Sequence, residues 1–381
     1  MTIAGSLGQL ITQTSDEDLP PLALDHAAML IASTIAAAAL GYEVTSSRIV
    51  RGLTKEQGGT PESSLWFDGA KVPAANAART NALTSDASAS DDSDLRTTMH
   101  SGTNVAATSL AIAERTGASG REVLGAMVLG YEVAGRIAQA CMPEFKKRGY
   151  HHHNIVCFAS TVACGRLLKL DAQQMAQAIG LAANSMGGLI AAAETEAREY
   201  FAGNAAMLGV NAVLAAQRGY LGEEAALDAK GGFFAVYGAR DPEFVTRDWG
   251  GQWAIVTEMA VKILPGGHPF HAFAEAGINA ALEGNVAVDE VESITIARPA
   301  DKLLRPPSHP TDLVGMAHSA AYYTAAGIAD RDFGWGHASP EKIADPVIHG
   351  LIDKIRIGEP VTDNLERFRL GARVTIRTKD G

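Results

Sequence analysis

Residues 262–271 read Lys-Ile-Leu-Pro-Gly-Gly-His-Pro-Phe-His, and the pattern of the sequence differs on the two sides of this stretch. Its Pro-Gly-Gly segment interrupts regular structure, because proline lacks a backbone donor and glycine is conformationally free. Before it, apolar residues recur at helical spacing; after it, short runs alternate between apolar and polar residues, which is typical of half-buried strands. The sequence therefore predicts a mainly α-helical protein, with a large all-helical domain over residues 1–261 and a smaller α+β domain over residues 262–381.

The elements expected in each domain follow from these two periodicities. In the first domain a run of Ser, Thr and Asp over residues 84–98 is almost free of apolar residues and is interpreted as an exposed loop. Helices are expected from residue 22 onward and at 73–83, 104–114, 121–141, 154–168, 171–190 and 203–217. In the second domain we expect helices at 268–283 and 313–328, and strands at 291–296, 354–357 and 373–377.

The composition is that of a folded, acidic protein. Of its 381 residues 47% are hydrophobic and 20% charged, so the chain can bury a large core and is not disordered. A net charge of −11 without a basic block argues against nucleic-acid binding, because phosphate contacts need a basic stripe. Apolar runs such as Ile35–Leu40 are far shorter than the ~20 residues that span a bilayer, and we expect no membrane segment. Cys141, Cys157 and Cys164 lack zinc or disulfide spacing, which indicates reduced thiols and a cytoplasmic location.

The histidines lie at the edges of predicted loops and helices. His151, His152 and His153 begin a predicted helix, where adjacent residues point about 100° apart. We therefore predict that the three do not share a metal ion and that the protein has no metal site. His100 ends the polar run, and two interpretations stay open: an acid–base group oriented by Asp91, or a surface histidine in a solvated acidic loop.

Lys262, His268 and His271 bracket the Pro-Gly-Gly segment. They would give this acidic protein a cationic pocket for a small anionic ligand at a domain junction; the alternative is a loop whose charged residues are simply solvated. The chain has no phosphate-binding loop, no Rossmann fingerprint and no Gly-x-Ser-x-Gly nucleophile. Nucleotide-dependent and serine-hydrolase functions are therefore disfavoured.

Several short motifs follow one another in a distinctive order. They are Gly58-Gly59-Thr60-Pro61-Glu62, Asp91-Asp92 with the following His100-Ser101-Gly102, Gly130-Tyr131-Glu132, Gly203-Asn204-Ala205-Ala206, Lys262 to His271, and His318-Ser319-Ala320-Ala321-Tyr322. Their order resembles the MmgE/PrpD family, which includes 2-methylcitrate dehydratase, cis-aconitate decarboxylase and iminodisuccinate epimerase. The resemblance extends from about residue 22 to the end of the chain.

The resemblance implies a large all-helical domain, a smaller α+β domain, a homodimer, an active site between the domains, and no metal or organic cofactor. It implies a lyase that removes a proton next to a carboxylate of a small di- or tricarboxylate, with the developing charge stabilised by cationic side chains. The residues to which it assigns roles are His100 and His151 as general acid and base, Tyr322 as donor or proton relay, Asp91 as an orienting group, and Lys262, Arg198, His268 and His271 as substrate-binding groups.

Departures from the family pattern leave the reaction open. Ala89 stands where the family has the first Asp of its Asp-x-Asp-Asp motif, and Arg198 stands where relatives often carry lysine. We expect a 2-methylcitrate dehydratase-like hydro-lyase of propionate catabolism. Decarboxylation and epimerisation, an isomerase reaction, are alternatives on the same scaffold, and a catalytically impaired binding paralogue is a third. The chain ends in Asp380-Gly381, a hairpin signal without a second strand. We therefore expect a smaller domain that is C-terminally incomplete relative to the family, either because the chain is truncated or because this member lacks the closing elements.

Overall fold

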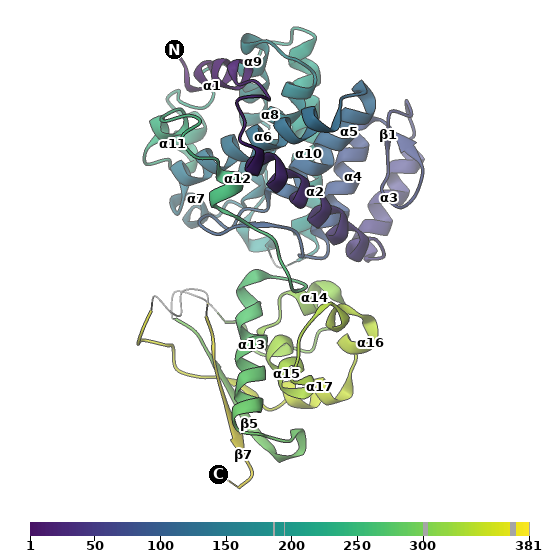
Figure 1. Ribbon diagram of the computed structural model, residues 1–381, viewed down its shortest axis with the longest axis vertical. Coiled ribbons are helices and arrows are strands. Elements are labelled where there is room, and N and C mark those ends of the chain that lie inside the picture. The colour runs from purple at the N-terminus through teal and green to yellow at the C-terminus, as the bar shows by residue number, and fades with distance from the viewer. Residues whose placement is uncertain (186, 194, 300–303, 366–370, 381) are drawn as a thin grey trace. The chain divides into compact units, whose positions relative to one another are not determined.

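The computed structural model describes all residues except 186, 194, 300–303, 366–370 and 381 (Figure 1). Contacts divide the chain into two compact units, which are described separately. The larger contains Met1–Ala87 and Asp91–Val261, and the smaller contains Lys262–Gly381 together with Ser88–Ser90. Helices dominate the described residues, and the predicted combination of a helical and an α+β part is confirmed.

The larger unit is built from helices and two short strand pairs. Strand β1 pairs with β2, and β3 with β4, both antiparallel. The elements are α1 (Ile3–Gln13), α2 (Pro21–Gly41), α3 (Thr45–Gln57), β1 (Ser63–Ser64), β2 (Lys71–Val72), α4 (Ala74–Asp86), β3 (Ser93–Asp94), α5 (Ser101–Thr116), α6 (Gly120–Cys141), α7 (Glu144–Lys147), α8 (His153–Leu167), α9 (Ala172–Ala183), α10 (Ala197–Gln217), α11 (Phe233–Tyr237), α12 (Ala254–Thr257) and β4 (Met259–Ala260).

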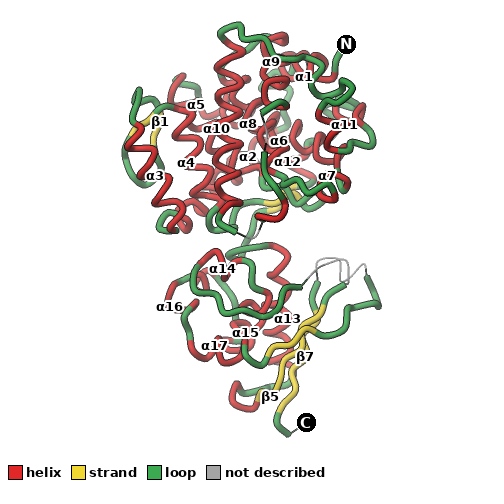
Figure 2. Tube along the Cα trace, turned by 180° about the vertical axis from the view of Figure 1, so that it is seen from behind, coloured by secondary structure: helices red, strands yellow, loops and turns green. Residues whose placement is uncertain are grey.

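Small residues let the central helices of the larger unit approach closely. Helix α4 packs against α10, α10 packs against α8, and α8 packs against α6 (Figure 2). A Cβ atom at Gly130 of α6 would lie 2.7 Å from the backbone oxygen of Ala159 in α8, and one at Gly203 of α10 would lie 2.8 Å from that of Arg79 in α4. The three cysteines are also buried in this unit as free thiols. The alanine- and glycine-rich sequence therefore forms a dense helical core.

We expect Gly41→Ala to destabilise the protein by about 1–3 kcal/mol, because it overpacks the contact between α2 and α4. A Cβ atom at Gly41 would lie 2.1 Å from the backbone oxygen of Thr84, and backbone cannot move aside as a flexible side chain can. Gly52→Ala in α3 is the matched control, since a Cβ there meets nothing within 4 Å. That control should stabilise helix α3 by about 0.5–1 kcal/mol. Equal effects of the two changes in urea unfolding would contradict this account.

The Ser/Asp-rich segment is not the exposed loop that its composition predicts. Residues 84–94 are buried, because α4 continues to Asp86 and the segment then enters strand β3. Some of its polar groups are hydrogen-bonded inside the protein: Asp94 Oδ1 accepts hydrogen bonds from the backbone N–H groups of Arg96 and Thr97, each at 2.8 Å. The loop prediction was wrong because a polar segment can be buried when neighbouring backbone groups supply its hydrogen bonds.

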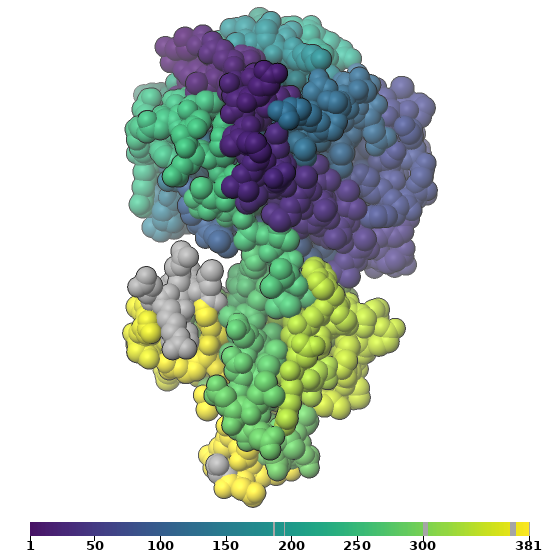
Figure 3. Space-filling view, in the orientation of Figure 1, coloured from purple at the N-terminus to yellow at the C-terminus, as the bar shows by residue number. Residues whose placement is uncertain are grey.

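Helix α2 is the one helix among the described residues that is long and apolar enough to cross a membrane, judged by length and composition. One face of it is buried against α4, α5 and α6, as for a core helix, and such helices pass the same test. The other face lies on the surface, where Leu22 and Met29 are 54% and 45% exposed; Figure 3 shows α2 in dark purple on the visible side of this unit. Length and composition alone are weak evidence for a membrane span.

The smaller unit has a three-stranded sheet in the order β6-β5-β7, with β6 parallel and β7 antiparallel to the central β5. The three strands lie where the alternating patterns predict them. Ser319 caps α15 by accepting from the N–H of Tyr322, and the predicted helix at 313–328 is consequently divided in two. The elements are α13 (His268–Glu283), β5 (Val291–Ala297), α14 (Leu313–Ala317), α15 (Ala320–Asp330), α16 (Pro340–Ile343), α17 (Pro346–Ile352), β6 (Ile355–Ile357) and β7 (Arg373–Thr378).

Candidate active site

Three consecutive histidines converge at the N-terminus of α8. The ring centroids are 4.0 Å apart for His151 and His152, 4.5 Å for His152 and His153, and 4.8 Å for His151 and His153. The expectation that their rings diverge was wrong, because only His153 lies in the helix while His151 and His152 belong to the preceding loop and cap. One ring nitrogen from each lies within 4.8 Å of the others.

Burial keeps these three imidazoles neutral. Their exposed fractions are 1%, 6% and 1% in sequence order. Loss of solvation, followed by repulsion from neighbouring histidines, lowers the pKa of His151, His152 and His153 far below the ordinary value. Each ring is therefore uncharged at pH 7 and carries one nitrogen lone pair.

His100 stands next to this cluster and contacts the Ser/Asp-rich segment. It occupies the cap position before α5, and its ring centroid is 4.9 Å from that of His152. Its Nδ1 lies 2.7 Å from the backbone oxygen of Asp92 and 3.2 Å from Oδ2 of Asp91. The structure thus brings together His100, Asp91 and His151, three of the residues singled out from the sequence. A carboxylate and a carbonyl at Nδ1 fix the ring orientation and direct Nε2 away from them.

Asp92 contacts His100 through its backbone oxygen, and its side chain is hydrogen-bonded to Tyr131, a partner that the sequence analysis did not identify. Tyr131 donates a hydrogen bond to Asp92 Oδ2 at 2.7 Å, and the backbone N–H of Gly102 donates to Oδ1 at 2.9 Å. Burial, followed by the nearby charge of Asp91, raises the pKa of Asp92 to about 6. Tyr131 lies within the Gly-Tyr-Glu motif, but nothing in the spacing indicates that its hydroxyl reaches this aspartate.

Arg198 at the start of α10 is held by carboxylates of the protein itself. Its Nε lies 2.9 Å from Asp86 Oδ2, its Nη2 lies 3.7 Å from Glu199 Oε2, and Nη2 also donates to the backbone oxygen of Asp86. Oδ1 of Asp86 lies in turn 3.7 Å from Nε2 of His153. The sequence assigns Arg198 to a substrate carboxylate, and that role stays a prediction. The two acidic partners of the guanidinium were missed because their pairing depends on tertiary contacts.

Glu199→Gln should change how stability depends on pH. Burial raises the pKa of Glu199 from 4.5 to about 7, so the folded protein retains a proton that the unfolded chain releases above about pH 4.5. Between about pH 4.5 and pH 7 the wild type should lose up to ~3 kcal/mol of unfolding free energy relative to the glutamine variant. Urea unfolding of both proteins at pH 5, 6, 7 and 8 measures this difference. Parallel pH profiles would show that Glu199 titrates normally.

The smaller unit contains a second group of predicted site residues. Lys262 is 3% exposed, and its Nζ donates to the backbone oxygen of Ala89 at 2.6 Å. The rings of His268 and His271 lie 5.3 Å apart, and His271 Nε2 is 3.2 Å from the backbone oxygen of Pro265. Burial, with the nearby charge of Lys262, lowers the pKa of His271 to about 4. At neutral pH His271 is therefore uncharged.

Two adjacent tyrosines of α15 occupy different environments. The hydroxyl of Tyr322, the predicted proton relay, donates to the backbone oxygen of His337 at 2.8 Å. The hydroxyl of Tyr323 donates instead to the backbone oxygen of Pro265 at 2.7 Å, and its ring lies 5.9 Å from that of His271. Tyr323 is thus the tyrosine that lies next to the predicted binding group, although the sequence motif points to its neighbour.

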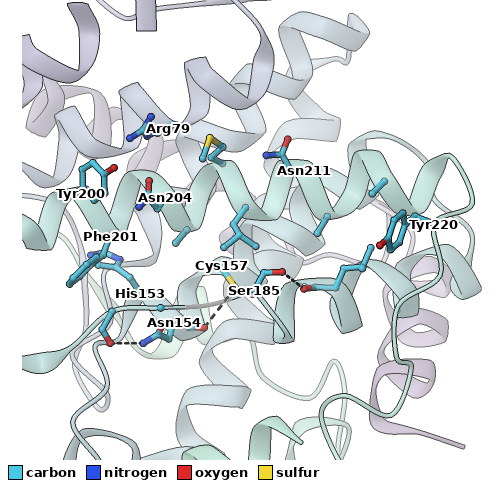
Figure 4. Close-up of a pocket in the computed structure, with 18 residues that line it drawn as sticks. Arg79, His153, Asn154, Cys157, Ser185, Tyr200, Phe201, Asn204, Asn211 and Tyr220 are labelled. Carbon is cyan, nitrogen blue, oxygen red and sulfur yellow. Dashed lines mark hydrogen bonds between the residues drawn. The ribbon is translucent and has the colours of Figure 1, made fainter. Parts of the chain in front are cut away.

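A cavity of about 930 Å³ opens beside the histidine cluster within the larger unit. His153 and Asn154 of α8 line it, and Figure 4 shows Phe201 of α10 next to His153. On the opposite wall the guanidinium of Arg79 lies 5.2 Å from the ring centroid of Tyr200. Sequence reasoning did not find this cavity, because its walls come from helices far apart in the chain, namely α4, α8, α9 and α10.

Comparison with known proteins assigns the two units to one family. The MmgE/PrpD N-terminal domain matches residues 5–245, and the MmgE/PrpD C-terminal domain matches residues 265–381. The chain belongs to the MmgE/PrpD family. Within it, His100, His151 and Arg198 fall in the N-terminal match and Tyr322 in the C-terminal match, whereas Lys262 lies between the two.

Three MmgE/PrpD relatives are similar to the chain over about two thirds of its length. The cis-aconitate decarboxylases of Homo sapiens and Mus musculus are each 26% identical to it, over 273 and 276 residues, covering 69% of this chain and 56% of the relative. The cis-aconitate decarboxylase-like protein oryM of Aspergillus oryzae is 26% identical over 283 residues, covering 69% and 58%. The chain thus spans a little over half the length of the curated relatives it matches.

Proposed function

We propose that the protein is a lyase of the hydro-lyase type that acts on a small di- or tricarboxylate such as 2-methylcitrate. The observation that carries this proposal is the pairing of His100 with Asp91 beside buried, neutral histidines. A neutral imidazole can take a proton from carbon, and a histidine oriented by a carboxylate can return one to a leaving group. Membership of the MmgE/PrpD family supports the same class of chemistry.

In the proposed reaction, His151 removes the proton from the carbon next to a substrate carboxylate. The C–H electron pair forms the new C=C bond as the C–O bond breaks, and the departing hydroxide takes a proton from the imidazolium form of His100 and leaves as water. The negative charge that develops during the reaction must be stabilised by hydrogen-bond donors whose positions are fixed before the reaction. Lys262, His268 and His271 are proposed to bind a substrate carboxylate, for which the buried ammonium group of Lys262 is the natural partner.

Decarboxylation is the second candidate, favoured by the names of the three relatives, all of which are cis-aconitate decarboxylases or like them. In that reaction the C–C bond to a carboxylate breaks, carbon dioxide leaves, and the electron pair remains on carbon until a histidine supplies a proton. The same acid–base pair can serve both reactions, because each requires one proton transfer at carbon.

A panel of 2-methylcitrate, citrate and cis-aconitate in deuterated water, analysed by mass spectrometry, tests the proposal. Loss of water supports the hydro-lyase, and loss of carbon dioxide supports the decarboxylase. Deuterium uptake without elimination would identify an epimerase instead. A ligand-induced rise in melting temperature without turnover would identify a binding paralogue. No conversion by the folded protein would overturn the lyase proposal.

We also propose a homodimer in the cytoplasm that needs no metal or organic cofactor for this reaction. Light scattering should then give twice the mass of the 39.8 kDa chain. Activity should survive dialysis against a chelator. A monomeric mass or loss of activity that added metal restores would overturn the corresponding part of the proposal.

A further inference from the structure

The histidine cluster contains buried nitrogens that make no hydrogen bond within the described structure. Among the residues that the structure describes, Nε2 of His152 and both ring nitrogens of His153 have no hydrogen-bond partner. Their side chains are more than nine-tenths buried, so water cannot freely compensate. An unpaired buried polar atom destabilises the folded protein. Several such atoms at one point indicate a position that a ligand completes.

We infer that His151, His152 and His153 form a binding site for a divalent transition-metal ion, with Zn²⁺ the best match. One ring nitrogen from each lies within 4.8 Å of the others. Zn–N bonds of about 2.0–2.1 Å around a tetrahedral ion place ligand nitrogens roughly 3.4 Å apart. Rotation of the rings about their side-chain bonds would therefore close the remaining gap. Three imidazole ligands with a fourth, open position is an established coordination set for zinc.

A fourth histidine, His100, lies beside the cluster, with its ring centroid 4.9 Å from that of His152. His100 is not counted as a ligand, since its Nδ1 faces Asp92 and Asp91.

Charges on both sides of the cluster bear on a cation. Asp86 Oδ1 lies 3.7 Å from His153 Nε2, in the place of the carboxylates that often support zinc-bound histidines. Asp91 adds a second buried carboxylate through His100. Arg198, which Asp86 and Glu199 hold, and Lys146 oppose the ion, since both are cationic side chains that act electrostatically on His151. We expect the carboxylates to offset these two cations.

The cavity gives an ion a route to the cluster. His153 lines this space together with Asn154, whose side-chain amide donates to the backbone oxygen of Gly188 at 3.0 Å (Figure 4). A water molecule in the cavity could occupy the fourth coordination position. Binding itself does not depend on the proposed reaction. If that reaction also holds, Zn²⁺ should inhibit it, because the metal would occupy the lone pair with which His151 accepts a proton.

The test uses the full chain after dialysis against a chelator, with Co²⁺ as a spectroscopic probe and Zn²⁺ as competitor. We expect one equivalent of Co²⁺ to give the intense visible absorption that is typical of a Co²⁺ ion with a low coordination number. Zn²⁺ should abolish this absorption by displacing Co²⁺. His152→Gln and His153→Gln should each weaken binding at least ~100-fold, the upper end of the effect seen for outer-shell partners. If one variant fails to fold by circular dichroism, the other carries the comparison.

A surface histidine pair of the smaller unit provides the matched control. His309 Nδ1 lies 2.7 Å from His349 Nδ1, and the pair is solvent-accessible. The double variant His309→Ala/His349→Ala should leave the stoichiometry and affinity for Co²⁺ unchanged. Binding that this double variant abolishes, binding that survives the cluster variants, or no Co²⁺ absorption in the wild type would each overturn the site. All three readouts are independent of substrate, so failure of the lyase proposal would be seen separately.

Discussion

Arg198→Ala is expected to lower the free energy of unfolding by about 3–5 kcal/mol. Arg198 is 6% exposed, and its guanidinium lies near the carboxyl groups of Asp86 and Glu199. Its removal would leave acidic groups in a buried environment without this cation, and the solvation lost on folding would no longer be offset by the ion pairs. Urea unfolding monitored by circular dichroism measures the change.

The contrast with an exposed ion pair makes this prediction specific. Arg247 Nη1 lies 3.0 Å from Asp241 Oδ2, with both side chains about half exposed, and Arg247→Ala should leave stability almost unchanged. Arg198→Lys should be intermediate, because lysine retains the charge but loses the forked geometry of the guanidinium. If Arg198→Ala were as mild as Arg247→Ala, the Arg198 pairs would contribute little to the fold.

His100→Asn is expected to lower kcat by about 10²–10⁴ on whichever acid of the panel is converted, the range usual for loss of an acid–base group. The asparagine amide can still donate to the backbone oxygen of Asp92, where Nδ1 of His100 now lies at 2.7 Å. The variant therefore removes proton transfer while preserving the local contact. Steady-state kinetics with an unchanged melting temperature would separate a catalytic effect from misfolding.

A second histidine that contacts a backbone carbonyl provides the control for His100. His26 Nδ1 lies 3.0 Å from the backbone oxygen of Ile255, and His26→Asn should leave kcat unchanged. Asp91→Asn should lower kcat less than His100→Asn, because Asp91 acts on the reaction through the orientation of His100. Equal activity of His100→Asn and wild type would remove His100 from the proposed mechanism.

Local patterns were sufficient to predict much of the fold. The Pro-Gly-Gly segment after Leu264, the alternating strands and the apolar helical spacing are all sequence-local signals, and the mainly helical and α+β parts that they predict are present. The order of the motifs identified the MmgE/PrpD family, which the domain matches confirm. The polar composition of residues 84–94 misled because burial depends on partners that are distant in sequence, such as Tyr131 for Asp92.

The candidate site could be predicted by residue type and only partly by geometry. The sequence brought His100 and Asp91 together through a motif, and the structure places them 3.2 Å apart. It could not show that His151–His153 converge, because their arrangement depends on where α8 begins. Nor could it show that Asp86 engages Arg198, since these residues lie in helices α4 and α10. The exact end of a helix and the register between helices are tertiary properties.

Because all three cysteines are buried, the rate at which their thiols react can report transient opening of the larger unit. Cys141, Cys157 and Cys164 lie in the core of the larger unit, and burial raises the pKa of Cys141 and of Cys164 to about 12. Because the thiolate is the reactive form, alkylating reagents should modify Cys141 and Cys164 only when the helices separate transiently, whereas Cys157 lines the cavity. The sequence contains no other cysteine, so labelling rates would measure excursions of the larger unit alone. Thiol-exchange kinetics could therefore follow breathing of the helical core without any engineered probe.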